Sequence, residues 1–206
     1  MQSLLEGKTV IFLGSSVTFG ACSGGYSFVD HLARQTGLHA VKEAVSGTTL
    51  VDNGDQSYIA RLKRLPRQLK PDAFLCQLST NDATQGRPLG AISASRAMED
   101  FDTQTVTGAL EYIIAYVQSV YHCPVLFFTG TRYDSPAYAQ MVEQLHALAK
   151  KWPIAILDLW NDEAMNAVSA EDYRRFMHDP IHPTLAGYTD WWSPKFAAFL
   201  ADQLGG

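Results

Sequence analysis

The stretch VIFLGSSVTFG, residues 10–20, decides the fold that this chain is expected to adopt. Its first four residues are apolar and predict a short buried strand. Such a run is too continuous for a half-exposed strand and is typical of a parallel sheet covered on both faces. The small residues that follow predict a turn in which a hydroxyl stands clear of the backbone. The stretch therefore predicts a strand that ends on a polar turn, where a helix begins.

Similar apolar runs recur along the chain, with helix-like intervals between them. They predict further strands at residues 73–78, 125–128 and 154–157, and a weaker one at 41–45. The intervals include helical patterns at 106–120 and 137–150, and a helix over 184–204 that Pro194 should kink or split. These repeated βα units predict the α/β class, as a three-layer α/β/α sandwich around a five-stranded parallel sheet. We find no linker or repeat, so residues 1–206 are expected to form a single domain.

Composition excludes several classes of function. The 16 Lys and Arg residues against 21 Asp and Glu give a net charge of −5, which argues against nucleic acid or an anionic membrane as the main partner. No apolar run approaches the roughly 18 residues of a membrane span. The cysteines, Cys22, Cys76 and Cys123, are odd in number and widely spaced, which fits a reducing compartment. Residues 1–8 lack the basic region of a secretory signal, so a cytoplasmic location is expected.

Polar turns follow three of the predicted strands. They are the turn at 14–20, Ser46-Gly47 and the run at 79–82. Ligands of open parallel sheets bind at the carboxyl ends of the strands, so these turns are expected to meet at one edge. Near the C-terminus a proline-containing turn brings Asp179 and His182 within side-chain reach. A hydroxyl, a carboxylate and an imidazole are thus available for one site.

In this order, from Gly14 to His182, the motifs resemble those of the SGNH or GDSL-type serine hydrolases. The resemblance implies the flavodoxin-like strand order 2-1-3-4-5. It implies Ser16 as nucleophile, Asp179 and His182 as the acid and base of a triad, and Gly47 and Asn81 as donors to the oxyanion.

Two positions depart from the family pattern. Ser15 stands where the family usually has Asp, and Ser79 where it usually has Gly. Neither is a triad position, so the departures concern the oxyanion geometry and substrate preference.

The chemistry of these residue types agrees with such roles. A serine hydroxyl is a poor nucleophile at neutral pH and needs a base, and a histidine with an ordinary pKa of about 6.5 can accept its proton. Asp179 would orient the His182 ring and stabilise the imidazolium. Gly47, the Asn81 amide and the backbone N–H of Ser16 would stabilise the oxyanion. The predicted reaction is therefore ester hydrolysis through an acyl-enzyme, with no metal or organic cofactor.

The substrate is less well defined by the sequence. Few residues are left for a cap domain, which favours an open site and a small acyl group. Acetylated carbohydrates, short-chain or aryl esters, and lipid-derived esters all remain open. Arg132 and Tyr133 follow the fourth predicted strand and are the first candidates for substrate contacts, and the irregular stretch 82–100 is a candidate lid. The sequence does not indicate an oligomeric state.

Other interpretations stay open. The first turn could hold a phosphate or flavin in a non-catalytic binding module, although no glycine-rich nucleotide motif follows the strand. A degenerate hydrolase is a second alternative, motivated by Ser15 and Ser79. A third is a metal site of His178, Asp179 and His182, for which no further ligand stands at a recognisable spacing.

Two further features are interpreted as structural. Cys22, just past the first turn, could be a reactive thiol near the site, but the favoured interpretation is a small buried residue. A basic cluster is taken as a solvated helix face; its members are Arg61, Lys63, Arg64, Arg67 and Lys70.

Overall fold

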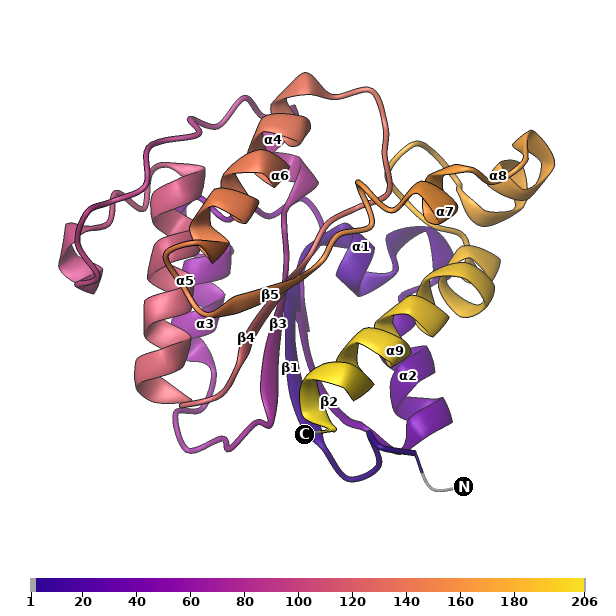
Figure 1. The fold of residues 1–206 in the computed structure, drawn as a ribbon, viewed down its shortest axis with the longest axis horizontal. Coiled ribbons are helices and arrows are strands. Elements are labelled where there is room, and N and C mark those ends of the chain that lie inside the picture. Colours follow the sequence, from indigo (N-terminus) through magenta and orange to yellow (C-terminus); the bar gives the residue numbers. More distant parts are fainter. Residues whose placement is uncertain (1–2, 206) are drawn as a thin grey trace.

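A five-stranded parallel sheet forms the centre of the molecule (Figure 1). The structure is a computed structural model that describes residues 3–205. The order of the strands is β2-β1-β3-β4-β5, which confirms the predicted order and fold class. The strands are β1 (Thr9–Gly14), β2 (His39–Ala44), β3 (Ala73–Gln77), β4 (Val125–Phe128) and β5 (Ile154–Leu157).

Burial differs between the middle and the edges of the sheet. Strands β3 and β4 are buried throughout, and β1 is buried after its first residue. The edge strand β2 is only half-buried, and so is β5. The prediction that residues 154–157 form a fully buried strand is therefore wrong. An edge strand has a neighbour on one side only, so its apolar residues keep contact with solvent.

Helices cover both faces of the sheet (Figure 1). One face carries α3 (Tyr58–Arg64), α5 (Val106–Val120) and α6 (Pro136–Ala149), and the other carries α2 (Phe28–Thr36) and α9 (Ser193–Leu204). Side chains alternate along a strand, so β1 supplies both cores. Ile11 and Leu13 pack into the first core, whereas Val10 and Phe12 pack into the second.

Shorter helices occupy the loops. They are α1 (Ser16–Phe19), α4 (Thr80–Thr84), α7 (Glu163–Asn166) and α8 (Ala170–Phe176), with the 3-10 turns η1 (Ala21–Ser23) and η2 (Met98–Asp100). Helices α1 and α4 begin where β1 and β3 end, which is the edge at which the sequence placed its polar turns. No helix within residues 3–205 has both the length and the apolar character needed to cross a membrane.

The C-terminal helix bends around its proline without separating into two helices. A π-helical segment, η3 (Gly187–Trp192), runs directly into α9, and Pro194 lies in the first turn of α9. The N–H of Ser193 donates to the carbonyl of Tyr188, one residue further back than in an α-helix. The widened turn accommodates a residue that has no N–H and whose ring crowds the preceding turn.

The irregular segment after α4 lies against α5 and away from α1 (Figure 1). The carbonyls of Pro88 and Leu89 accept hydrogen bonds from the first two residues of α5. Lys151 donates to the carbonyl of Ser93 at 2.7 Å, and the buried carboxylate of Glu111 accepts from the N–H of Ser93 at 2.8 Å. The segment is thus fixed to the α5 side of the molecule, and it does not cover the strand ends as the predicted lid would.

The core between α2 and α9 supports a first prediction. Phe28 is fully buried, and its ring stacks on Phe196 with 3.8 Å between centroids. Phe28→Ala should lower the free energy of unfolding by about 3–5 kcal/mol, because it removes this contact and leaves a cavity. Chemical denaturation measures the loss, with Leu4→Ala at a largely exposed position as the control. A loss below about 1 kcal/mol would contradict the importance of this packing.

Candidate active site

The turn after β1 is shaped by a buried amide. The side-chain oxygen of Gln77 accepts hydrogen bonds from the N–H of Ser15 at 3.0 Å, the N–H of Thr18 at 3.2 Å and the Thr18 hydroxyl at 2.7 Å. Its side-chain nitrogen donates to the Ser15 hydroxyl at 3.1 Å. A Cβ at Gly14 would overlap the Thr18 side chain, so only glycine fits there. These contacts fix Ser16 at the first position of α1.

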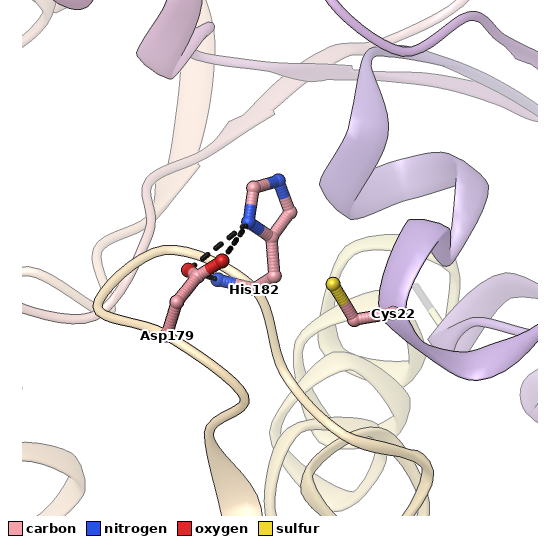
Figure 2. A group of neighbouring side chains, drawn as sticks. All are labelled: Cys22, Asp179 and His182. Atoms are coloured by element: carbon pink, nitrogen blue, oxygen red, sulfur yellow. Dashed lines mark hydrogen bonds and ion pairs between the residues drawn. The ribbon is translucent and has the colours of Figure 1, made fainter.

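Ser16, His182 and Asp179 lie in one chain of hydrogen bonds. The Nε2 atom of His182 lies 2.8 Å from the hydroxyl of Ser16, a residue 166 positions away in the sequence. Its Nδ1 atom lies 2.8 Å and 3.0 Å from the two carboxylate oxygens of Asp179 (Figure 2). The sequence predicted this meeting of hydroxyl, ring and carboxylate, and the structure brings the three groups together.

The turn that carries His182 is organised by Asp179. Its Oδ1 atom accepts hydrogen bonds from the backbone N–H groups of Ile181 and His182, both at 2.8 Å. Partial burial tends to raise the pKa of Asp179, but these bonds and the neighbouring ring outweigh it, so the pKa of this carboxyl lies below its ordinary value. The side chain is therefore an anion at neutral pH, as the orientation of the imidazole requires.

The three groups predicted to bind the oxyanion have N–H donors free of protein partners among residues 3–205. Asn81, at the second position of α4, uses one side-chain N–H to bind the carbonyl of Thr48 at 3.0 Å, and an amide nitrogen has two donors. Gly47 lies on the exposed turn after β2 with a φ of 80°, a conformation that favours glycine. Within residues 3–205 the N–H groups of Ser16 and Gly47 have no protein acceptor.

A buried carboxylate ties the Gly47 loop to α4. Asp82 is fully buried and accepts hydrogen bonds from the N–H groups of Leu50 at 2.8 Å and Val51 at 3.1 Å. Burial raises the pKa of Asp82, and the two backbone bonds counteract part of that effect. The hydroxyl of Ser79 caps α4 and also donates to the carbonyl of Thr48 at 3.2 Å. The loop and the helix that carries Asn81 therefore move as one unit.

Arg61 is a second buried charge below the site, which corrects its interpretation as a solvated residue. Its side chain is 1% exposed, whereas the other four residues of the basic cluster are exposed. The guanidinium donates to the carbonyls of Gly14 at 2.8 Å, Glu43 at 2.9 Å and Gln56 at 3.0 Å. The sequence contains a signal for the burial of Arg61, because this residue stands three positions after Tyr58, on the same buried face of α3.

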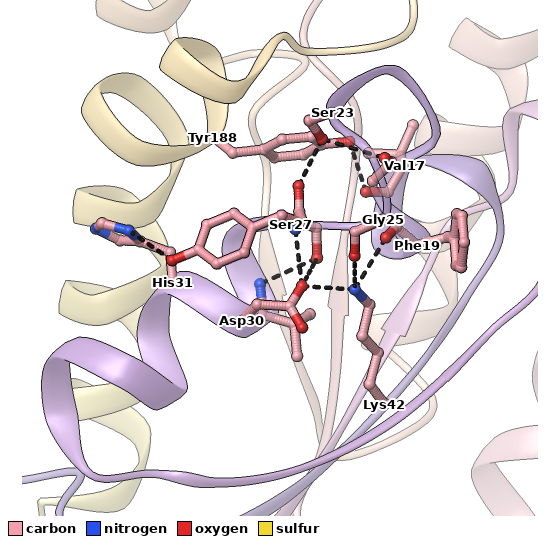
Figure 3. A network of polar contacts seen from close by, with 12 residues as sticks. Val17, Phe19, Ser23, Gly25, Ser27, Asp30, His31, Lys42 and Tyr188 are labelled. Carbon is pink, nitrogen blue, oxygen red and sulfur yellow. Dashed lines mark hydrogen bonds and ion pairs between the residues drawn. The ribbon is translucent and has the colours of Figure 1, made fainter.

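The loop after α1 is held by Lys42 (Figure 3). Its ammonium donates to the carbonyls of Phe19 and Gly25, each at 2.9 Å, and forms an ion pair with Asp30 at 2.6 Å. The hydroxyl of Tyr188 donates to the carbonyl of Val17 at 2.7 Å from the other side. The segment that begins at Ser16 is thus bound to the sheet through Lys42 of β2 and to the C-terminal helical segment through Tyr188 of η3.

Cys22 lies beside Asp179 and His182 (Figure 2). The prediction of a small buried residue is wrong, because the side chain is only partly buried. Burial and the negative charge of Asp179 raise the pKa of the thiol. It is therefore a neutral thiol at neutral pH and no competing nucleophile. Its place near the site agrees with the alternative interpretation from the sequence, which rested on its position just past the first turn.

Arg132 and Tyr133, the two residues predicted to contact the substrate, differ in their exposure to solvent. Arg132 is exposed, and its backbone N–H donates to Asn166 at 2.7 Å. The ring of Tyr133 packs against Tyr138 and Trp160, and its buried hydroxyl has no partner among the described residues. Burial raises the pKa of Tyr133 to about 12. The polar tip of Tyr133 thus faces the interior, and a substrate contact stays a prediction for Arg132.

The sequence from residue 12 to residue 189 matches the GDSL-like Lipase/Acylhydrolase family. The chain belongs to this family. Membership confirms the resemblance found in the motifs and makes the protein a hydrolase of an ester-cleaving family. A comparison with curated proteins gave no match.

Solved structures of similar fold come from several bacteria. A protein of Lactobacillus plantarum has a TM-score of 0.80 at 21% identity, with 96% of this chain and 98% of that one covered. A member of the lipolytic G-D-S-L family from Veillonella parvula has a TM-score of 0.65 at 18% identity, with 94% and 97% covered. A family two carbohydrate esterase from Clostridium thermocellum, in complex with cellohexaose, has a TM-score of 0.67 at 14% identity, with 97% and 65% covered. At these identities the likeness concerns the fold.

The contacts of Arg61 lead to a second prediction. Arg61→Lys should lower the free energy of unfolding of this hydrolase by about 3 kcal/mol, because one ammonium cannot reach all the buried carbonyls that the guanidinium binds. Denaturant titration measures the change. Arg67→Lys, at an exposed position near the same helix, should change stability by less than about 0.5 kcal/mol. Equal effects of the two substitutions would show that the buried bonds contribute nothing.

Proposed function

We propose that the protein hydrolyses carboxylic esters through an acyl-enzyme formed on Ser16. The observation that carries the proposal is the continuous chain of hydrogen bonds from the Asp179 carboxylate through His182 to the Ser16 hydroxyl. Nucleophile, base and orienting carboxylate in hydrogen-bond contact are the arrangement that activates a serine. Membership in an acylhydrolase family supports the same chemistry.

The first half of the reaction is acyl transfer to Ser16. Nε2 of His182 takes the proton of the Ser16 hydroxyl as the oxygen attacks the ester carbonyl, and Asp179 stabilises the imidazolium that forms. Collapse of the tetrahedral intermediate breaks the bond to the alcohol oxygen, which receives the proton from His182. A water molecule then gives a proton to His182 as it attacks the acyl carbonyl. Collapse of this second intermediate breaks the bond to the Ser16 oxygen, which takes the proton back from His182 as the acid leaves.

The oxyanion is stabilised on the other side of Ser16. The backbone N–H groups of Ser16 and Gly47 and the second side-chain N–H of Asn81 supply the donors. Because Asp82 and Arg61 hold this loop in place before substrate binds, little reorganisation is needed in the transition state.

The substrate is proposed to be a short acyl group on a hydroxylated alcohol. A cavity of about 290 Å³ adjoins Gly47, and the residues that line it include several with hydroxyl, amide and carboxylate groups: Thr48, Asn53, Asp55, Gln56 and Ser57. Such walls suit hydroxyl groups better than a long acyl chain. The structural neighbour named as a carbohydrate esterase supports an acetylated carbohydrate as the first substrate class to assay.

Ser16→Ala should lower the turnover of an aryl acetate by at least about a thousandfold, because the acyl-enzyme can no longer form. A fluorophosphonate probe should label the unaltered protein at Ser16 and leave Ser16→Ala unlabelled. Ser119→Ala, on the exposed side of α5, is the control and should keep both labelling and turnover. Peptide mass spectrometry identifies the labelled residue.

A lack of both fluorophosphonate labelling and ester turnover would count against the proposed function. A folded protein that the probe does not modify, and that turns over no ester in a panel of acetyl, butyryl and longer acyl substrates, would contradict the hydrolase. The result would favour the two alternatives open from the sequence, a degenerate hydrolase or a ligand-binding module.

Asn81→Ala should lower turnover about a hundredfold or more, since one lost oxyanion donor costs about 3 kcal/mol in the transition state. The free energy of unfolding should change much less, because Ser79 and Asp82 still hold α4. Steady-state kinetics beside a denaturation curve separates the two effects. Unchanged turnover would remove Asn81 from the mechanism.

A further inference from the structure

Three metal-binding side chains of different kinds meet at the outer side of His182. The sulfur of Cys22, a ring nitrogen of His182 and a carboxylate oxygen of Asp179 all lie within 4.8 Å of one another (Figure 2). Each residue is partly exposed, so an ion can reach the group from solvent. Thiolate, imidazole and carboxylate are the ligands that zinc takes in proteins. We propose that this group binds Zn²⁺ and that the bound ion inhibits the hydrolase.

The distances require only small movements. Zinc bonds of about 2.0–2.3 Å at tetrahedral angles place the ligand atoms about 3.4 Å apart. The Nδ1 atom of His182 lies 2.8 Å from Asp179, so this pair must open by about half an ångström. The sulfur of Cys22 must approach by at most about 1.4 Å, which rotation about one side-chain bond can supply. A water molecule completes four ligands.

The movement falls on the side chain of Cys22, because Lys42 holds the backbone on either side of it. Cys22 lies in the 3-10 turn η1, between Gly20 and Gly24, which both have positive φ angles. A Cβ built at Gly24 meets no atom within 4 Å, so this end of the turn is open. His182 and Asp179 stand together in their own short turn, so the group is completed by a slight opening of this pair and a rotation of the Cys22 side chain. When the metal binds, the thiol proton passes to the solvent and the ring proton of His182 moves from Nδ1 to Nε2.

A metal ion at Nδ1 would stop the reaction, and this step rests on the proposed function. His182 has to accept the proton of Ser16 at Nε2, and the charge of Asp179 has to stabilise the resulting imidazolium. Bound zinc takes the carboxylate as a ligand and places positive charge beside the ring. With Nδ1 bound to the metal, the ring proton lies on Nε2, so His182 cannot accept the proton of Ser16 and turnover falls while the fold is unchanged.

Metal binding is tested without reference to activity. Cd²⁺ serves as the probe, because its bond to a thiolate absorbs in the ultraviolet. Titration of Ser16→Ala protein, which retains all three ligands, should produce this absorption. Adding Cys22→Ser to the Ser16→Ala protein should abolish it, and adding Cys123→Ser, at a buried cysteine elsewhere, should leave it unchanged. Absorption that persists without Cys22, or that never appears, would overturn the proposed site.

Inhibition is tested on the active protein. Micromolar Zn²⁺ should suppress ester turnover, and a chelator should restore it. Cys22→Ser should raise the half-inhibitory Zn²⁺ concentration at least tenfold, while Cys123→Ser should not change it. Equal inhibition with and without Cys22 would overturn the inhibitory role of the site. Cd²⁺ absorption in a protein that hydrolyses no ester would support the metal site and count against the proposed function alone.

Discussion

The edge of the sheet that carries Ser16 depends on one buried guanidinium. Arg61 donates to the carbonyls of Gly14 and Glu43, near the ends of β1 and β2, and to the hydroxyl of Thr48 in the loop beyond β2. A buried carbonyl without a donor costs about 1–3 kcal/mol, and a rigid fork with five donors satisfies several at once. Because the charge itself is expensive to bury, the protein tolerates few other arrangements of these loops. A single interaction thus sets the spacing between the Ser16 turn and the Gly47 loop.

Ser15 and Ser79, the two departures from the family pattern, extend this buried network. The Ser15 hydroxyl is fully buried and accepts from the side chain of Gln77, which in turn holds the turn before Ser16. Ser79 caps α4 and binds the carbonyl of Thr48, so it joins the helix of Asn81 to the Gly47 loop. Both hydroxyls have partners within the protein. Through these contacts they hold the turn before Ser16 and the loop of Gly47, which carry donors that we propose for the oxyanion.

Hydrophobic patterns predicted the strands well, because short apolar runs are a local property of the chain. The helix over 106–120 has the predicted bounds for the same reason. Charge predicted the burial of Arg61 less well. A cluster of basic residues is usually exposed to solvent, but the helical periodicity of α3 places Arg61 on the buried face. Residues 154–157 are partly exposed because β5 is the last strand of the sheet. Its edge position follows from the order of the strands and cannot be seen in the apolar run itself. The contact of Cys22 with Asp179 depends on tertiary structure, and no spacing in the sequence encodes it.

The distance between Ser16 and His182 also depends on the aromatic core behind them, which includes Val17 and packs against Ile181. Tyr188, shortly after His182, donates its hydroxyl to the carbonyl of Val17, the residue after Ser16. The ring of Tyr188 is fully buried and lies beside Phe28 and Trp192, at 6.4 Å and 6.1 Å between centroids. Packed interiors transmit shifts because they hold few voids. The aromatic core between α2 and α9 therefore supports the geometry of the candidate site through the bond from Tyr188 to Val17.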